Sequence, residues 1–202
     1  MNFKFPNIAK LWPVLILLAS GGCGSIGQVQ NAATMGTNDA YFIIGVQPEF
    51  TRISVDEGGI VDGKFQGSLA TRLFGGNLVF MGEPEDGFVL GKARGGALLG
   101  ITMAQPHSSK TALLGPLLTP CESKRGYMHR DGSKTLVFTA DAGKVSYIAN
   151  VRYMWVKDGM VPTYNADLEG ARAFLKVHYP LLADSLVQGH YDEIVAGLCV
   201  WS

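Results

Sequence analysis

The chain has 202 residues, with 17 basic and 17 acidic side chains and a formal net charge of zero. This balance, with no run of lysine or arginine, lacks the electrostatic footprint of a protein that binds nucleic acid. The 26 glycines are scattered among short apolar runs, which indicates many turns and a β-rich fold. A chain of this length buries about 70% of its unfolded surface, enough for one good core.

The front of the chain has the pattern of an export signal. Lys4 and Lys10 give a positive start with no acidic residue, and Leu11–Ala19 is an apolar run that contains Pro13. As a helix this run would span about 14 Å, whereas the hydrocarbon core of a bilayer is ~30 Å thick. The run is therefore too short for a mature transmembrane helix.

Small residues and a cysteine follow the apolar run, in the order Ser20, Gly21, Gly22 and Cys23. This segment resembles the bacterial lipobox, in which an aliphatic residue and two small residues precede a cysteine. Gly21, Gly22 and Cys23 match, and Ser20 stands where the family prefers Leu. The resemblance implies that the signal is cleaved before Cys23, that the Cys23 thiol is lipidated, and that the new N-terminus is acylated, for example with palmitate. Because Gly24 is not the Asp that favours inner-membrane retention, it further implies the outer membrane, facing the periplasm.

Two other interpretations of this segment stay open. An ordinary signal cleaved near Ser20–Gly22 would leave Cys23 as a free thiol. Alternatively, Gly22–Gly27 formally fits the G-x-G-x-x-G nucleotide fingerprint, which needs a helix directly after it. Residues 28–36 are short and polar, so the pattern favours the lipoprotein.

The other two cysteines are Cys121 and Cys199. If Cys23 carries lipid, an even pair remains in an exported chain, which favours a Cys121–Cys199 disulfide. The alternative is a pair of buried free thiols.

The sequence predicts three parts: a signal peptide over residues 1–22, a lipidated flexible tether over 23–39, and a single globular β-rich domain with C-terminal helices over 40–202. Residues 24–39 are small and polar, and as a random coil they would reach roughly 20–25 Å. We expect such a tether to hold the domain clear of the lipid headgroups.

Short runs of β-branched and aromatic residues predict strands in the domain. The predicted strands are Tyr41–Val46, Phe50–Val55, Ile60–Gln66, Leu69–Phe74, Leu78–Met81, Phe88–Lys92, Ala97–Met103, Thr135–Thr139 and Val145–Val156. Turn residues predict hairpins at Asp56–Gly59, Gly75–Asn77, Arg94–Gly96 and Asp141–Lys144. The continuous apolarity of the first strand predicts a central position. Strict alternation in the last strand places on one face Val145, Tyr147, Ala149, Val151, Tyr153 and Trp155.

The apolar period becomes helical near the C-terminus. Asn165 or Asp167 can cap a helix that ends before Pro180, and Pro180 can start a second helix. Ile194–Trp201 fits either a helix or a strand. The expected fold class is mainly β (α+β): an immunoglobulin-like or transthyretin-like sandwich, or an open barrel, with a C-terminal helical pair. Leu136–Val151 resembles a strand–turn–strand of small bacterial lipoproteins that have such sandwiches and no established activity.

The pattern of chemically active residues indicates no catalytic constellation, metal site or cofactor. The histidines, His107, His129, His178 and His190, have no metal-ligand spacing. Gly87–Ala93 is one residue short of a P-loop and lacks its Ser or Thr. The acidic loop Glu83–Gly87 could hold calcium but reads better as a solvated loop. The aromatic stripe of Tyr147, Tyr153 and Trp155 reads better as core than as a ligand platform.

The sequence therefore favours a membrane-anchored bacterial envelope lipoprotein that acts as a non-enzymatic binding or scaffolding domain. Its expected contacts are the membrane, through the lipid, and another envelope protein. The alternative is an exported, hydrolase-like enzyme whose active-site residues are dispersed along the chain.

Overall fold

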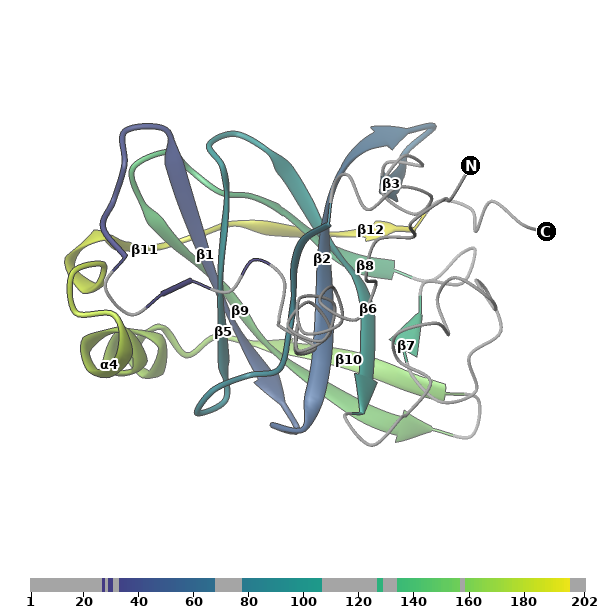
Figure 1. Cartoon of the computed structure of the whole chain (residues 1–202). Coiled ribbons are helices and arrows are strands. Elements are labelled where there is room, and N and C mark those ends of the chain that lie inside the picture. The colour runs from purple at the N-terminus through teal and green to yellow at the C-terminus, as the bar shows by residue number, and fades with distance from the viewer. Residues whose placement is uncertain are drawn as a thin grey trace, which may run out of the picture.

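The structure is a computed structural model, and it describes residues 27, 29–30, 33–67, 78–106, 127–128, 134–156 and 159–196. Two curled β-sheets pack face to face, and one helix lies beside the first of them (Figure 1). The mainly β class predicted from the sequence is confirmed.

The described part of the chain contains twelve strands, one α-helix and one short 3₁₀ helix. They are β1 (Asp39–Gln47), β2 (Thr51–Val61), β3 (Lys64–Gly67), β4 (Leu78–Gly82), β5 (Phe88–Arg94), β6 (Leu98–Pro106), β7 (Tyr127–Met128), β8 (Lys134–Thr139), β9 (Val145–Val156), β10 (Gly159–Asn165), α4 (Leu168–His178), η2 (Ala183–Ser185), β11 (Leu186–Gln188) and β12 (Tyr191–Val195).

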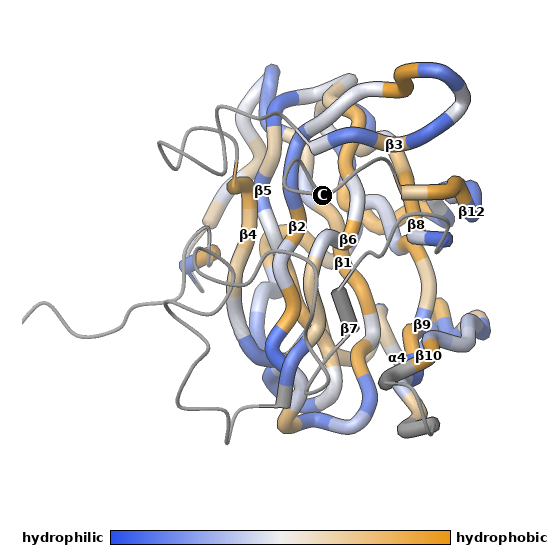
Figure 2. Tube along the Cα trace, turned by 90° about the vertical axis from the view of Figure 1, so that its right-hand side faces the viewer, coloured by the Kyte–Doolittle hydropathy of each residue, from blue (hydrophilic) through white to orange (hydrophobic). Residues whose placement is uncertain are grey.

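Each of the two sheets has its own strand order. The first sheet has the order β10-β9-β1-β5, with β11 also paired to β9; the second has the order β12-β8-β6-β2-β3, with β4 paired to β2 and β7 to β6. Strands β4 and β5 lie on the opposite side of the sandwich from β10 and β12 (Figure 2). Figure 2 shows β4 and β5 on the left of the molecule and β10 and β12 on the right.

Strand β1 is the central strand that the sequence predicted. It lies between β9 and β5, and its residues from Ala40 to Ile44 are at most 2% exposed. Phe42 and Ile44 point into the core between the sheets, whereas Tyr41 and Ile43 belong to a second core on the outer face. A strand buried on both faces needs a nearly continuous apolar sequence, and this one has it.

A β-bulge in β9 overturns the predicted one-face alternation of that strand. Strands β1 and β9 are parallel, and Ile43 pairs with Tyr147 but Gly45 pairs with Asn150, so β9 has one extra residue at this point. A bulge moves every later side chain to the other face. Val145 and Tyr147 therefore join the outer core with α4, whereas Val151 and Tyr153 join the core between the sheets.

Two predicted hairpins are instead connections between the sheets. Strand β5 pairs with β1 and not with β6, and β9 pairs with β1, β10 and β11 but not with β8. The turns around Gly95 and Ala142 lie against each other, because a Cβ added at Gly95 would be 2.5 Å from the Cβ of Ala142. Turn residues predict that the chain reverses, but they do not predict which strand the next strand pairs with.

The predicted turn at Asp56–Gly59 is also wrong. Strand β2 continues to Val61, and the chain reverses at Asp62 and Gly63, which both have positive φ values, 51° and 72°. The second sheet curls until Phe65 of β3 bridges Ala196 just beyond β12. The Phe65 ring packs over Gly58 and Gly100, where added Cβ atoms would meet it at 2.7 and 2.6 Å. These glycines are needed because an aromatic ring occupies the space of their side chains.

The C-terminal region holds one α-helix rather than the predicted pair. Asp167 caps α4 by accepting a hydrogen bond from the Gly170 N–H at 2.9 Å, as the capping pattern predicted. After Pro180 the chain forms the short helix η2 and then β11, which pairs in parallel with the start of β9. The second helix does not form because β9 offers an open hydrogen-bonding edge to this segment. Tyr191–Val195 forms β12, so the start of the ambiguous terminal run is a strand.

We predict that Gly91→Ala lowers the free energy of unfolding by about 1–3 kcal/mol, the usual cost of overpacking a core. The new Cβ would lie 2.1 Å from the Phe42 ring, which also contacts Phe80 and Phe138. Urea unfolding measures the effect. Gly59→Ala is the matched control, because nothing lies within 4 Å of its added Cβ; equal losses in the two variants would contradict the packing argument.

Candidate functional site

The residues to which the sequence assigns chemistry, Cys23, Cys121 and Cys199, lie outside the described residues. The lipid attachment and the disulfide therefore stay predictions. His107 and His129 also lie outside the described part of the chain.

The chain just before β1 packs on the body of the domain. We call residues 27, 29–30 and 33–38 the N-terminal strap. Val29 is only 8% exposed and belongs to the outer core, and Ala33 and Met35 pack against that core. The Tyr179 hydroxyl donates a hydrogen bond to the Val29 carbonyl at 3.3 Å. The sequence predicts a flexible tether here, whereas in the structure these residues cover the outer face of the first sheet.

Gly27 is the first described residue of the strap, and it lies against β4. Its φ is +74°, and an added Cβ would be 2.0 Å from the Val79 carbonyl oxygen. Only glycine combines this backbone conformation with such a close approach. No helix follows Gly27 in the described residues before β1, so the helix that the nucleotide fingerprint needs is not formed by residues 33–38.

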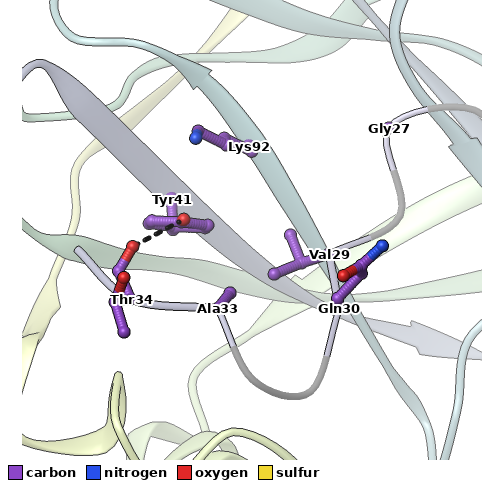
Figure 3. Close-up of a pocket in the computed structure, with 7 residues that line it drawn as sticks. All are labelled: Gly27, Val29, Gln30, Ala33, Thr34, Tyr41 and Lys92. Atoms are coloured by element: carbon purple, nitrogen blue, oxygen red, sulfur yellow. Dashed lines mark hydrogen bonds between the residues drawn. The ribbon is translucent and has the colours of Figure 1, made fainter. Parts of the chain in front are cut away.

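A groove of about 540 Å³ lies between the strap and the first sheet. In Figure 3 the labelled strap residues lie around this groove, while Tyr41 of β1 and Lys92 of β5 form its sheet side. The described residues that line it are Gly27, Val29, Gln30, Ala33, Thr34, Tyr41 and Lys92. The Tyr41 hydroxyl donates to the Thr34 carbonyl at 3.3 Å and so fastens the strap to β1.

The charge in the groove is already compensated. The Lys92 ammonium lies 2.7 Å from the Asp39 carboxylate and 5.7 Å from the centre of the Tyr41 ring. The hydrogen bond that the Lys92 ammonium donates to the Asp39 carboxylate raises the pKa of Lys92, because it favours the charged form. The described lining residues supply an ammonium, a phenol, a hydroxyl and an amide but no carboxylate, imidazole or thiol. This set can bind polar groups, but it does not form an acid–base pair.

His178 is the described histidine with the most contacts. Its Nε2 lies 2.8 Å from Asp86 and its Nδ1 lies 3.5 Å from Glu85, while its ring stacks on Phe174 at 4.6 Å between centroids. These contacts hold the end of α4 on the turn between β4 and β5. These contacts give His178 a structural role, and the exposed His190 contacts only Asp192 among the interactions described, at 3.5 Å.

The acidic side chains of the loop Glu83–Gly87 contact two different partners rather than gathering around one point. Glu83 pairs with Arg52 at 3.1 Å, and Glu85 and Asp86 pair with His178. Within the described ranges no three His, Cys, Asp or Glu side chains are placed to hold a metal ion.

Two members of the predicted aromatic stripe, Tyr147 and Tyr153, are core residues. Tyr147 is fully buried and Tyr153 is 4% exposed, on opposite faces of the sheet because of the bulge; the side chain of Trp155 lies outside the described part. The Tyr147 hydroxyl accepts from the Asp167 N–H at 2.6 Å and donates to Asn150 at 3.1 Å. Tyr147 thereby joins the bulge of β9 to the start of α4.

The comparisons with known proteins supply no relative. No family model, no curated protein sequence and no solved structure matches the chain. Among the residues that the structure describes, no helix has both the length and the apolarity needed to cross a membrane.

The strap is the feature that sequence reasoning missed. The polar stretch 24–39 contains only a few apolar residues, among them Val29 and Met35, and such sparse residues give no period. Their burial depends on the outer core, which exists only after α4 and β11 have packed on β1 and β9.

We predict that Val29→Ala loosens the strap and lowers the free energy of unfolding by about 1 kcal/mol, because it removes buried apolar groups. Hydrogen exchange of the strap amides should become faster. Gln30→Ala is the matched control, since Gln30 is the exposed neighbour. Equal exchange rates in the two variants would show that the strap is not held by Val29.

We predict that the folded state loses stability above about pH 10. Burial raises the pKa of the Tyr147 and Tyr179 phenols. The stabilisation from a neutral buried phenol is complete below the unfolded-state pKa of about 10 and is lost as the pH rises through the folded-state pKa. Urea unfolding between about pH 9 and pH 11 measures this loss.

Tyr147→Phe and Tyr179→Phe should each reduce the loss. The raised pKa of Lys92 acts in the same direction, so Lys92→Gln is the control that removes its share. A pH dependence that is identical in the wild type and in both phenylalanine variants would contradict the assignment to buried phenols.

Proposed function

We propose that this protein is a bacterial envelope lipoprotein, anchored to the outer membrane through Cys23 and facing the periplasm. In this proposal residues 1–22 are a cleaved signal peptide. The body is a non-enzymatic domain that binds or scaffolds another envelope component.

The observation that carries the proposal is that the strap begins close to the lipobox. Gly27 lies only four residues after Cys23, and from Gly27 onward the described chain packs on the domain. A folded body that begins this close to a signal of the lipobox type supports a domain presented directly from its anchor.

The β9–β10 edge of the first sheet supports a binding role for the body. Met154 of β9 and Val161 of β10 face each other across the strand pair, and each is 44% exposed. Adjacent exposed apolar side chains favour contact with another protein. The immunoglobulin-like or transthyretin-like character of the sandwich is also part of this proposal; two packed, curled sheets support it, and the parallel pairing of β1 with β9 is a departure from a purely antiparallel sandwich.

Cys23→Ser tests the anchor. We expect this variant to incorporate no tritiated palmitate and to remain unprocessed or to leave the membrane fraction, because the serine hydroxyl cannot replace the thiol in lipid transfer. Ser20→Leu is the matched control: it supplies the aliphatic residue of the lipobox and should keep the label. A Cys23→Ser protein that is cleaved and still fractionates with membranes would contradict lipid attachment at this residue.

A further inference from the structure

The place where the chain enters the fold is fixed by Gly27. Its backbone sits against the Val79 carbonyl of β4, closer than any other residue type allows. The next contacts are Val29 in the outer core and the hydrogen bond from Tyr179 to the Val29 carbonyl. The strap therefore crosses from the edge of the second sheet to the outer face of the first.

This entry point lies at an open seam of the sandwich. Within the described strands, β5 is the last strand of the first sheet and β4 pairs only with β2. The two strands approach each other without pairing. We call the region where Gly27 crosses from β4 towards β5 the β4–β5 seam.

The length of chain between the seam and the lipid is small. Only residues 24–26 separate Cys23 from Gly27. Even fully extended, these four steps span about 14 Å, which is less than half the width of a typical bilayer core. A chain this short leaves the domain little freedom to turn its other faces to the membrane.

Among the described residues, three basic side chains around the seam pair with carboxylates, and Glu85 and Asp86, in the turn between β4 and β5, both contact His178. Lys92 pairs with Asp39, Arg94 with Glu57 at 3.0 Å, and Arg52 with Glu83 at 3.1 Å. Such a surface carries neither a strong repulsion from anionic headgroups nor a polybasic attraction to them. The orientation would therefore be set by the short, docked chain and not by charge.

We propose that the β4–β5 seam is the face that the domain turns to the lipid surface. The proposal rests on the lipid anchor at Cys23 and adds an orientation to it. In this orientation β10 and β12, at the far ends of their sheets, point away from the bilayer (Figure 2). The exposed pair Met154 and Val161 is then presented to the periplasm.

Depth-dependent quenching tests the orientation. The full-length lipidated protein is reconstituted in vesicles of phosphatidylethanolamine and phosphatidylglycerol that contain a lipid with a nitroxide on its headgroup. A fluorescent residue is introduced by codon suppression either at Gln30, exposed on the strap, or at Glu193, exposed on β12. We expect quenching at least about twofold stronger at residue 30, because the proposed geometry keeps Gly27 within ~14 Å of the anchor and residue 30 lies only three residues further along the chain. Equal quenching at the two positions would overturn the orientation.

Two variants test whether the docked strap causes the orientation. Gly27→Ala forces a Cβ against the Val79 carbonyl, and an insertion of about twelve Gly and Ser residues after Ser25 lengthens the tether without touching the strap. Both should abolish the difference in quenching. Gly63→Ala is the matched control, since Gly63 also has a positive φ, 72°, but nothing lies within 4 Å of its added Cβ; it should keep the difference.

Flotation of the vesicles separates failure of the anchor from failure of the orientation. Protein that does not float with the vesicles overturns the lipid anchor and, with it, the orientation. Protein that floats but shows the full difference after the long insertion overturns only the role of the short, docked chain.

Discussion

The burial of β1 on both faces is the constraint on which the rest of the fold depends. A strand whose neighbouring side chains point alternately into two apolar layers needs a cover on each side. The second sheet covers one side of β1, and α4, the segment around η2 and the N-terminal strap cover the other. The only α-helix described in the outer cover is α4, with 11 residues. The strap adds to this cover, and its residue Val29 belongs to the outer core.

The bulge in β9 is related to the same constraint, the burial of the first sheet on both faces. Along the first half of β9 the outer face lies under α4 and needs apolar side chains, which Val145 and Tyr147 supply. Beyond the bulge the outer residues are Asn150, Arg152 and Met154, which suit a face that the helix no longer covers. One extra residue thus lets a single run of alternating apolar residues serve two cores. The hydroxyl of Tyr147 marks the transition, because it binds both Asn150 and the backbone at the start of α4.

Local signals predicted the parts of the fold that local energetics decide. The apolar run of β1, the Asp167 cap and the end of α4 before Pro180 follow from neighbouring residues, and the structure has them. Partner choice does not: the turns at Gly95 and Ala142 reverse the chain, yet each connects one sheet to the other. The prediction of a second helix was wrong for a similar reason. Leu186–Gln188 pairs with β9, and a local stretch of sequence does not reveal this partner. For the candidate site, the sequence assigned chemistry to Cys23 but gave no signal for the groove, which depends on where the strap packs.

The open edges of the sheets link the stability of the fold to its proposed setting. Exposed strand edges invite pairing with other chains, and proteins protect them. Here each edge is treated differently: Pro162 interrupts the donors of β10, the bridge from Phe65 to Ala196 brings β3 to the end of β12, and Gly27 crosses the seam at β4. Gly27 belongs to the segment of chain that would lead to the lipid. If the anchor fixes Cys23, the same short stretch of chain both restrains the domain and lies against the edge of β4, so release of the strap would loosen the orientation and expose that edge together.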